Sequence, residues 1–228
     1  MIEIFKVFPK TLQIGFLKIE DTVLITWVIM GLLFLFSLWI KRNLSLYNPG
    51  IFQLILEALV EGAERLCKEV IKNHHYKVLP FLLTLWIFIG ACNLIGVVPG
   101  LFPPTSDLNT PLAFAFSAFL MRHLLGIQLK GAKKYLGHFF KPFFFLFPLH
   151  LLAEITRSLA LAIRLFGNIL SGEFVALILL GIAGLFLPIP FIMLHLLFGL
   201  LQAYLFGILS LAFLSQVFEE NKIPEKED

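Results

Sequence analysis

The sequence predicts an all-α integral membrane protein that forms a single membrane domain over residues 1–228. Hydrophobic residues make up 59% of the chain, charged residues only 14%, and the mean hydropathy is +0.91. The apolar residues form stretches of about 20, the length that a helix needs to cross a bilayer, and alternating strand-like segments typical of a barrel are missing from the sequence. We therefore expect about five to six helices in a lipid bilayer, including an amphipathic surface helix and a long tilted C-terminal helical hairpin.

Residues 1–72 comprise three predicted segments: an N-terminal segment, an apolar span and an amphipathic helix. An N-terminal segment, 1–21, lacks the small-residue pattern of a removable signal peptide. The first span, 22–40, is free of charge and is closed by Lys41 and Arg42, so this end is expected in the cytoplasm and the N-terminus outside. Over 51–72, charged side chains recur at helical intervals among apolar ones, which predicts an amphipathic helix on the membrane surface.

The rest of the chain supplies the remaining spans. A second span covers 79–98, and the turn-rich link that follows it contains no Lys or Arg and should face away from the cytoplasm. A short third span, 111–127, leads into another basic link. Residues 148–218 are too long for one span and are interrupted by prolines, so they predict a long polar-striped hairpin, before a charged, cytoplasmic tail at 219–228.

Several functional classes are disfavoured by the same composition. The net charge of +3 does not indicate a nucleic-acid partner, because the basic residues lie in the links rather than on one basic face. Cys67 and Cys92 have no metal-ligand spacing, and the chain has no Gly-rich phosphate loop, zinc-binding His-Glu pair or serine nucleophile elbow. We expect no metal, no cofactor and no catalytic residue of an enzyme that acts alone.

Arg164 is the residue that points most directly to a function. It lies in a long apolar stretch, keeps its charge, and costs about 2.5–3.5 kcal/mol to place in hydrocarbon on insertion scales. Helical spacing puts it on one stripe with Arg157, Leu161, Asn168 and Ser171. Such a stripe must face protein or water. Glu173 follows nine residues later, half a turn away and about 13 Å along a regular helix.

The second helix of the hairpin carries a polar stripe of its own, because His195 and Gln202 fall on one face. Two positions of the turn remain open. If the chain turns at Gly181 to Gly184, Gln202 lies level with Arg164. If it turns at Pro188 to Pro190, Gln202 lies level with Ala176, close to Glu173.

Three separated segments carry a recognisable pattern. They are Asn93-Leu-Ile-Gly-Val-Val-Pro-Gly100 with Pro104-Thr-Ser-Asp-Leu-Asn109, then Arg164-Leu-Phe-Gly-Asn168 followed by Gly172-Glu173, and finally Leu201-Gln-Ala-Tyr-Leu-Phe206. In this order they resemble subunit a of the rotary F-type ATP synthase, the stationary half of its membrane proton path, over most of the chain. Two positions depart from the family: Ser158 stands where many members have Pro, and Phe213 where many have Tyr.

The resemblance implies a stator subunit with offset half-channels that carry protons to and from the carboxylates of a c-subunit ring, coupled to ATP synthesis. It implies Arg164 as the essential buried cation, and as further proton-translocating residues Glu173, His195, Gln202 and Asn168. A half-channel or its entrance would include Asp107, Asn93, Glu154 and Arg157. The implied partners are the c-subunit ring, b-type peripheral stalk subunits and the remainder of the complex, in a bacterial plasma (inner) membrane.

Other interpretations stay open. Arg164 could form a structural ion pair with Glu154 or Glu173, and Arg157 could pair with Glu154 or extend toward the interface. The alternative function is a proton-coupled secondary transporter of an anionic substrate, although the sequence shows no internal repeat with matching broken helices. The transported ion could be H⁺ or Na⁺, and the proton is the default.

Overall fold

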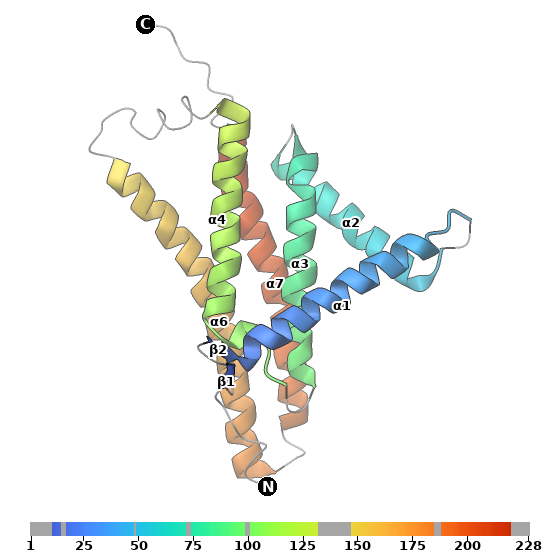
Figure 1. Ribbon diagram of the computed structural model, residues 1–228, viewed down its shortest axis with the longest axis vertical. Helices are drawn as coiled ribbons and strands as arrows, with labels where there is room; N and C mark the ends of the chain where they lie inside the picture. Colours follow the sequence, from blue (N-terminus) through green and yellow to red (C-terminus); the bar gives the residue numbers. More distant parts are fainter. Residues whose placement is uncertain are drawn as a thin grey trace, which may run out of the picture.

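The chain forms a bundle of long helices in the computed structural model (Figure 1). Among the described residues, five helices are long and apolar enough to cross a membrane. The prediction of an all-α membrane protein with about five to six helices is confirmed, and the chain is a multi-pass membrane protein. The structure describes residues 11–14, 17–47, 49–71, 74–98, 101–131, 147–184 and 188–219.

Four helices form the core of the bundle: α3 (Leu79–Leu94), α4 (Asn109–Lys130), α6 (Phe147–Ala183) and α7 (Pro188–Glu219). Contacts join α3 to α7, α6 to α7, and α4 to both α6 and α7. Side chains from all four meet in one buried apolar cluster that includes Ile89, Ala115, Leu165 and Phe206. Many large apolar residues also point outward, as expected of helices whose outer faces contact lipid or other subunits.

The shorter spans differ slightly from their predicted bounds. Helix α3 carries Pro80 in its first turn, where proline is tolerated, and continues into a short 3₁₀ turn, η3 (Ile95–Val97). Helix α4 extends beyond the predicted 111–127 at both ends. It stops at Gly131, whose positive φ of 77° is an angle that glycine adopts without steric cost. A second 3₁₀ turn, η4 (Pro104–Ser106), lies between α3 and α4.

The predicted hairpin consists of α6 and α7, which are 37 and 32 residues long. At 1.5 Å per residue these helices measure roughly 55 and 48 Å, well beyond a hydrocarbon core of about 30 Å. Helix α6 ends next to Gly184, whose φ is 71°, and α7 begins at Pro188. Figure 1 shows α6 packed against the bundle in its middle and diverging from α4 and α7 toward its N-terminal end.

The register of the hairpin decides between the two turn positions. The Asn168 side chain donates a hydrogen bond from Nδ2 to the Phe198 carbonyl oxygen, 3.4 Å away. Arg164 lies four residues before Asn168 on α6, and Gln202 lies four residues after Phe198 on α7. Gln202 and Arg164 are therefore on the same level, as the turn at the glycines requires.

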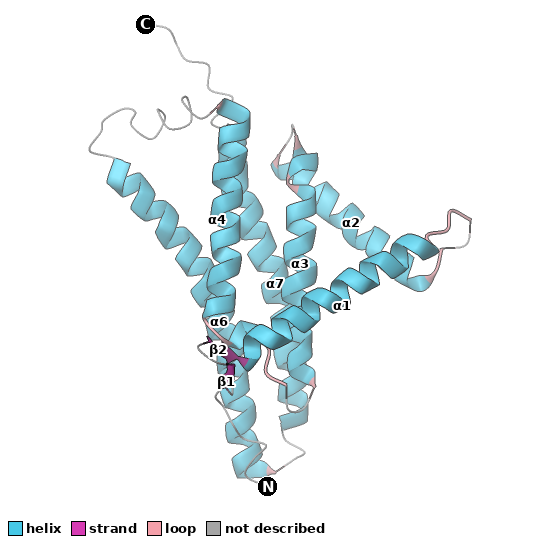
Figure 2. Cartoon of the chain, viewed as in Figure 1, coloured by secondary structure: helices cyan, strands magenta, loops and turns pink. Residues whose placement is uncertain are grey.

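A short β-ladder precedes the first span, in a segment for which the sequence predicted no element. Strand β1 (Thr11–Ile14) pairs antiparallel with β2 (Leu17–Glu20), so that Thr11 lies opposite Glu20 (Figure 2). Apolar and polar residues alternate in the two strands with the period of two that suits a ladder. The ladder leads directly into α1 (Asp21–Asn43).

Helix α1 lies outside the core bundle. It crosses the bundle obliquely in Figure 1, and of its 23 residues only Thr22 and Ile29 are buried. It contacts α3, η4 and β2. Most of the apolar surface of α1 therefore faces away from the rest of the chain, although the rings of Phe36 and Trp39 pack against Phe52 of α2.

Helix α2 (Ile51–Val70) occupies the segment predicted as amphipathic, 51–72. Ala63 and Cys67 are buried on its inner face, while two i,i+4 ion pairs, Arg65–Glu61 at 2.6 Å and Lys68–Glu64 at 2.7 Å, lie on the outside. Exposed pairs of this kind add little stability, so α2 is held by its apolar face.

The two ends of the bundle differ in their charges and in the helix ends that they bring together. The basic end is where α1 and α4 end and α3 and α6 begin; it carries Lys41, Arg42, Lys77 and Lys130. The far end is where α6 ends and α7 begins, together with η4.

Candidate functional site

Arg164 lies at the edge of the buried face of α6. That contact face comprises Leu161, Ala162, Leu165 and Ile169, all buried in the core. Arg164 itself is exposed, and it shares its edge with the exposed residues Arg157 and Ser171. The predicted stripe is therefore split, because Leu161 belongs to the core whereas the two arginines lie beside it.

The surroundings of Arg164 are apolar on the outside and polar on the inside. Its exposed neighbours on α6 are Ala160 and Gly167, about one turn to either side, and Ile163. Gln202, on the same level of α7, is only 6% exposed. A charged guanidinium thus opens onto an apolar outer surface with a buried amide behind it, which is suited to meeting a charged group on a neighbouring membrane protein.

Glu173 lies at the opposite edge of the same contact face, since nine residues span half a turn beyond two full turns. Its Oε1 atom is buried without a hydrogen-bond partner within the described part of the chain. The Ser106 hydroxyl of η4 lies beside the carboxyl group. Glu173 is therefore an oxygen-bearing group at the far end that needs water or a proton to be satisfied.

His195 of α7 packs directly against Gly172, the residue before Glu173. A Cβ atom at position 172 would overlap the His195 imidazole. Glycine at this position is what allows the ring to lie so close to α6. The structure thus brings His195 and Glu173 into one region at the far end.

Asn93 connects three segments near this region. Its Nδ2 donates to the Gly199 carbonyl oxygen at 2.8 Å, and its Oδ1 accepts from the Thr105 hydroxyl at 2.7 Å. The Asn168 bond to the Phe198 carbonyl lies one residue away along α7. Asn93 and Asn168 therefore line a continuous polar layer that holds α3, α6 and α7 together.

Asp107 lies at the far end beside the start of α1. Its carboxylate accepts hydrogen bonds from the Thr22 hydroxyl, at 3.2 Å, and from the backbone and side chain of Asn109. Glu20 at the end of β2 is its other neighbour. The hydrogen bond and negative charge of Asp107, with a smaller effect of burial, raise the pKa of Glu20 above its usual value. Glu20 is not among the residues predicted from the sequence, because nothing in its spacing indicates the contact with Asp107.

The basic end contains a cluster that the sequence predicted only in part. Glu154 forms an ion pair with Arg122 of α4, with 2.6 Å between Oε1 and Nε. Arg157 donates from Nη1 to Gln216 Oε1 at 2.7 Å. Glu154 thus pairs with Arg122 rather than with Arg164 or Arg157. Arg122 stands out in the sequence as a charge within an apolar span, whereas Gln216 gives no such signal.

The predicted residues therefore fall into three groups along the hairpin. Glu154 and Arg157 lie at the basic end, Arg164 and Gln202 in the middle, and the others at the far end: Glu173, His195, Asn168, Asn93 and Asp107. Among the described residues, no group of three His, Cys, Asp or Glu side chains is arranged to hold a metal ion.

The model of one protein family, the ATP synthase A chain, matches residues 23–215. This chain belongs to the ATP synthase A chain family. The match begins at the first turn of α1 and ends within α7, so it includes every predicted site residue. Glu20 and the β-ladder lie outside the matched range.

Individual relatives agree with this assignment. The chain is 46% identical over 203 residues to "ATP synthase subunit a" of Legionella pneumophila (strain Paris). The aligned region covers 89% of this chain and 88% of that protein. It is 43% identical over 219 residues to "ATP synthase subunit a 2" of Pelobacter propionicus, and the aligned region covers 95% of this chain and 96% of that protein. It is 41% identical over 212 residues to "ATP synthase subunit a 1" of Hahella chejuensis, and the aligned region covers 93% of this chain and 90% of that protein.

Proposed function

We propose that this A chain conducts protons as the stationary membrane subunit of an ATP synthase, with Arg164 as the essential cation between two offset half-channels. The observation that carries the proposal is the order of charges along α6. Glu154 lies ten residues from Arg164 toward the basic end, and Glu173 nine residues toward the far end. Along a regular helix these separations are about 15 and 13 Å.

The physical role of Arg164 follows from its charge and exposure. A carboxylate on a ring of c subunits prefers to be neutral while it moves through lipid. Beside the fixed guanidinium the ionised form is favoured, so the carboxyl group releases its proton there. The same positive charge repels a proton that would cross directly between the half-channels. Each proton that crosses a potential of 100 mV contributes about 2.3 kcal/mol toward rotation.

The half-channels follow from the remaining groups. At the far end, protons would enter past Asp107 and reach the ring by way of Glu173 and His195, with Asn93, Asn168 and Gln202 as polar neighbours. At the basic end, Glu154 and Arg157 would line the other half-channel. This subunit is not catalytic alone; its partners would be the c-subunit ring, b-type peripheral stalk subunits and the rest of the complex.

The alternative, a proton-coupled carrier of an anionic substrate, is less well supported. Carriers bind their substrates in a site enclosed between helices near the bilayer midplane. Arg164 instead opens onto an outer face whose exposed residues around it are Ala160, Ile163 and Gly167. A ring of helices fits such a surface better than a small anion does.

The proposed membrane is a bacterial plasma (inner) membrane, with the basic end in the cytoplasm. The support is the distribution of Lys and Arg, which accumulate in the links at that end and are missing from the sequence of the link between α3 and α4. This orientation places the N-terminus outside and the C-terminus in the cytoplasm.

The test is Arg164→Ala in inverted membrane vesicles, with Arg42→Ala as the control because Arg42 is also exposed but lies at the end of α1. Assembly is checked by co-purification of the ring and the soluble head. We expect Arg164→Ala to abolish ATP-driven proton pumping and ATP synthesis in assembled complexes, while Arg42→Ala retains both. Coupled activity in Arg164→Ala contradicts the proposal. Uptake of an anion without an associated ring favours the carrier. Repeating the assay with and without Na⁺ identifies the ion.

A further inference from the structure

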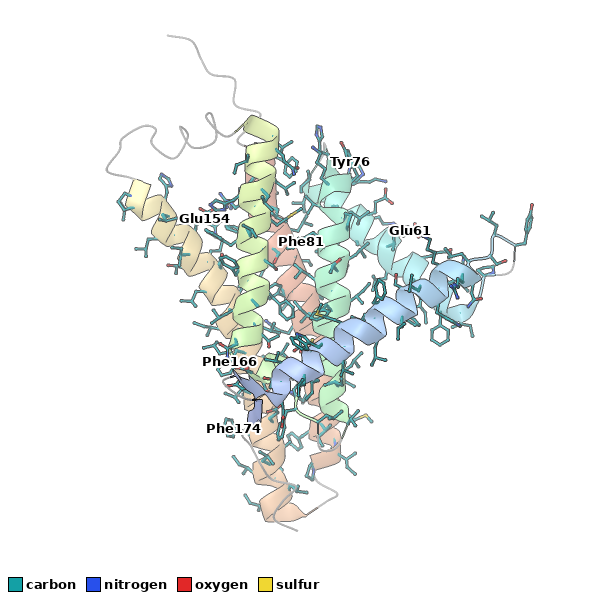
Figure 3. The ribbon with its side chains drawn as sticks, viewed as in Figure 1. Glu61, Tyr76, Phe81, Glu154, Phe166 and Phe174 are labelled. Carbon is teal, nitrogen blue, oxygen red and sulfur yellow. The ribbon has the colours of Figure 1, made fainter. Side chains whose placement is uncertain are left out.

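The first half of α6 is attached to the bundle by polar rather than apolar contacts. Of residues 148–160, all of which the structure describes, only Glu154 and Ser158 are buried. Four large apolar side chains of this stretch are exposed, and Leu151 is half-buried; the exposed ones are Leu149, Leu152, Ile155 and Leu159. Figure 3 shows Glu154 on the part of α6 that diverges from α4. The position of this part of the helix therefore depends on what Glu154 contacts.

Glu154 contacts a buried arginine. Arg122 of α4 is 9% exposed and Glu154 is 5% exposed, and their side chains form the 2.6 Å ion pair. His123, one residue along α4, approaches the second carboxylate oxygen to 3.8 Å. Because a buried ion pair can often be replaced by apolar residues at no loss of stability, stability alone is a weak reason for it. A pair of this kind does fix two helices at a defined distance.

The Arg122 guanidinium also reaches α7. Its Nη1 atom donates to Gln216 Oε1 at 2.9 Å and to the Phe213 carbonyl oxygen at 3.4 Å. The guanidinium carbon lies 4.3 Å from the centre of the Phe213 ring. One planar group with several fixed donors thus joins three helices, an arrangement that a lysine ammonium cannot reproduce.

Gln216 connects Arg122 to Arg157 through a shared hydrogen-bond acceptor. Its Oε1 atom accepts from Arg122 and also from Arg157 Nη1, 2.7 Å away. Arg157 lies on the same edge of α6 as Arg164, seven residues or about two helical turns toward the basic end. The two arginines can share one acceptor because Glu154 balances the charge of Arg122.

We propose that Arg122 is a positioning residue for the arginine-bearing edge of α6. Through Glu154 it sets how far the first half of α6 lies from α4, and through Gln216 it holds Arg157 in line with Arg164. This inference rests on the proposed function, in which that edge faces the rotating ring. Arg122 itself touches neither the ring nor the proton.

The test compares Arg122→Gln, Gln216→Leu and the charge-reversed double variant Arg122→Glu with Glu154→Arg in the assembled complex. Arg65→Gln is the matched control, because it breaks an exposed arginine–glutamate pair on α2. Two readouts are needed: the ratio of ATP-driven proton pumping to ATP hydrolysis, and the distance between spin labels at exposed positions 124 on α4 and 152 on α6.

We expect Arg122→Gln to lengthen the α4–α6 distance and to lower the pumping ratio by a factor on the order of ten to a hundred, the loss that accompanies a misplacement of about 1 Å. The charge-reversed variant should restore the distance and most of the ratio. Gln216→Leu should lower the ratio with the α4–α6 distance unchanged, because the ion pair remains. Arg65→Gln should change neither.

An unchanged distance and ratio in Arg122→Gln overturns the inference. So does a shortfall of assembled complex that the charge-reversed variant fails to repair, since this indicates a requirement for arginine that is unrelated to the pair. Arg164→Ala, measured in parallel, separates the two proposals. If Arg164→Ala pumps normally the proposed function fails, whereas if only Arg122→Gln pumps normally the proposed function stands without this inference.

Discussion

Replacing Gly172 by alanine tests the close packing of α6 against α7. The added Cβ atom would overlap the His195 ring, so either the ring leaves its position or the helices separate. Overpacking costs about 1–3 kcal/mol, and the gain from replacing a helical glycine offsets about 0.5–1 kcal/mol. We therefore expect the subunit to lose roughly 0–2.5 kcal/mol of stability, an amount compatible with assembly.

The effect on proton transfer should be larger than the effect on stability. His195 and Glu173 belong to the same proposed half-channel, and moving a working group by about 1 Å can lower a rate on the order of a hundredfold. The assay is ATP-driven acidification of inverted vesicles, normalised to the amount of assembled complex. Gly181→Ala on the same helix is the control, because a Cβ atom there meets nothing within 4 Å.

The double variant Gly172→Ala with His195→Ser separates packing from chemistry. The smaller serine makes room for the new methyl group, so stability should return to the wild-type value while acidification stays low. Wild-type acidification in Gly172→Ala, or in the double variant, would refute the assignment of His195 to the proton path.

Three further predictions concern other parts of the structure. Asn93→Leu removes the bond to the Gly199 carbonyl and should lower the stability of the purified complex by about 1–3 kcal/mol, the cost of an unsatisfied buried group, as measured by thermal unfolding. Because Asp107 raises the pKa of Glu20 above its usual value of 4.5, this contact contributes stability that is fully present below pH 4.5 and is lost as the pH rises through the raised pKa. The melting temperature of the purified subunit should accordingly fall as the pH rises from 4.5 through the raised pKa of Glu20. Asp107→Asn should make the melting temperature less dependent on pH over the same interval. Burial, reinforced by the charge of Glu64, raises the pKa of the Cys67 thiol to about 11, so a maleimide should label it slowly at neutral pH until the protein is denatured.

The sequence predicted the membrane class and the helices well, because lipid imposes long apolar stretches whose bounds are visible in the composition. Composition alone did not determine the position of the hairpin turn, because glycines and prolines that can each end a helix lie only a few residues apart. Tertiary contacts distinguish them: the bond between Asn168 and the Phe198 carbonyl, and the packing of His195 against Gly172.

The candidate site could be predicted where it follows one helix and not where it crosses between helices. Arg164 and Glu173 are separated by a fixed spacing on α6, so their placement on opposite edges of one face follows from the helical repeat. Helical periodicity does not determine how Gln216 meets Arg157, or how Glu20 meets Asp107, because these partners lie 59 and 87 residues apart in the chain. Their contacts depend on packing between helices.

The near-isolation of α1 has a consequence for the order in which the protein comes apart. A helix with only Thr22 and Ile29 buried adds little to the free energy that holds the other four spans together. Local opening should therefore begin with α1, leaving α3, α4, α6 and α7 intact as a cooperative unit. In hydrogen exchange of the isolated subunit, the amides of η4, which α1 contacts, should gain deuterium as early as those of α1, while the amides of α3 stay protected.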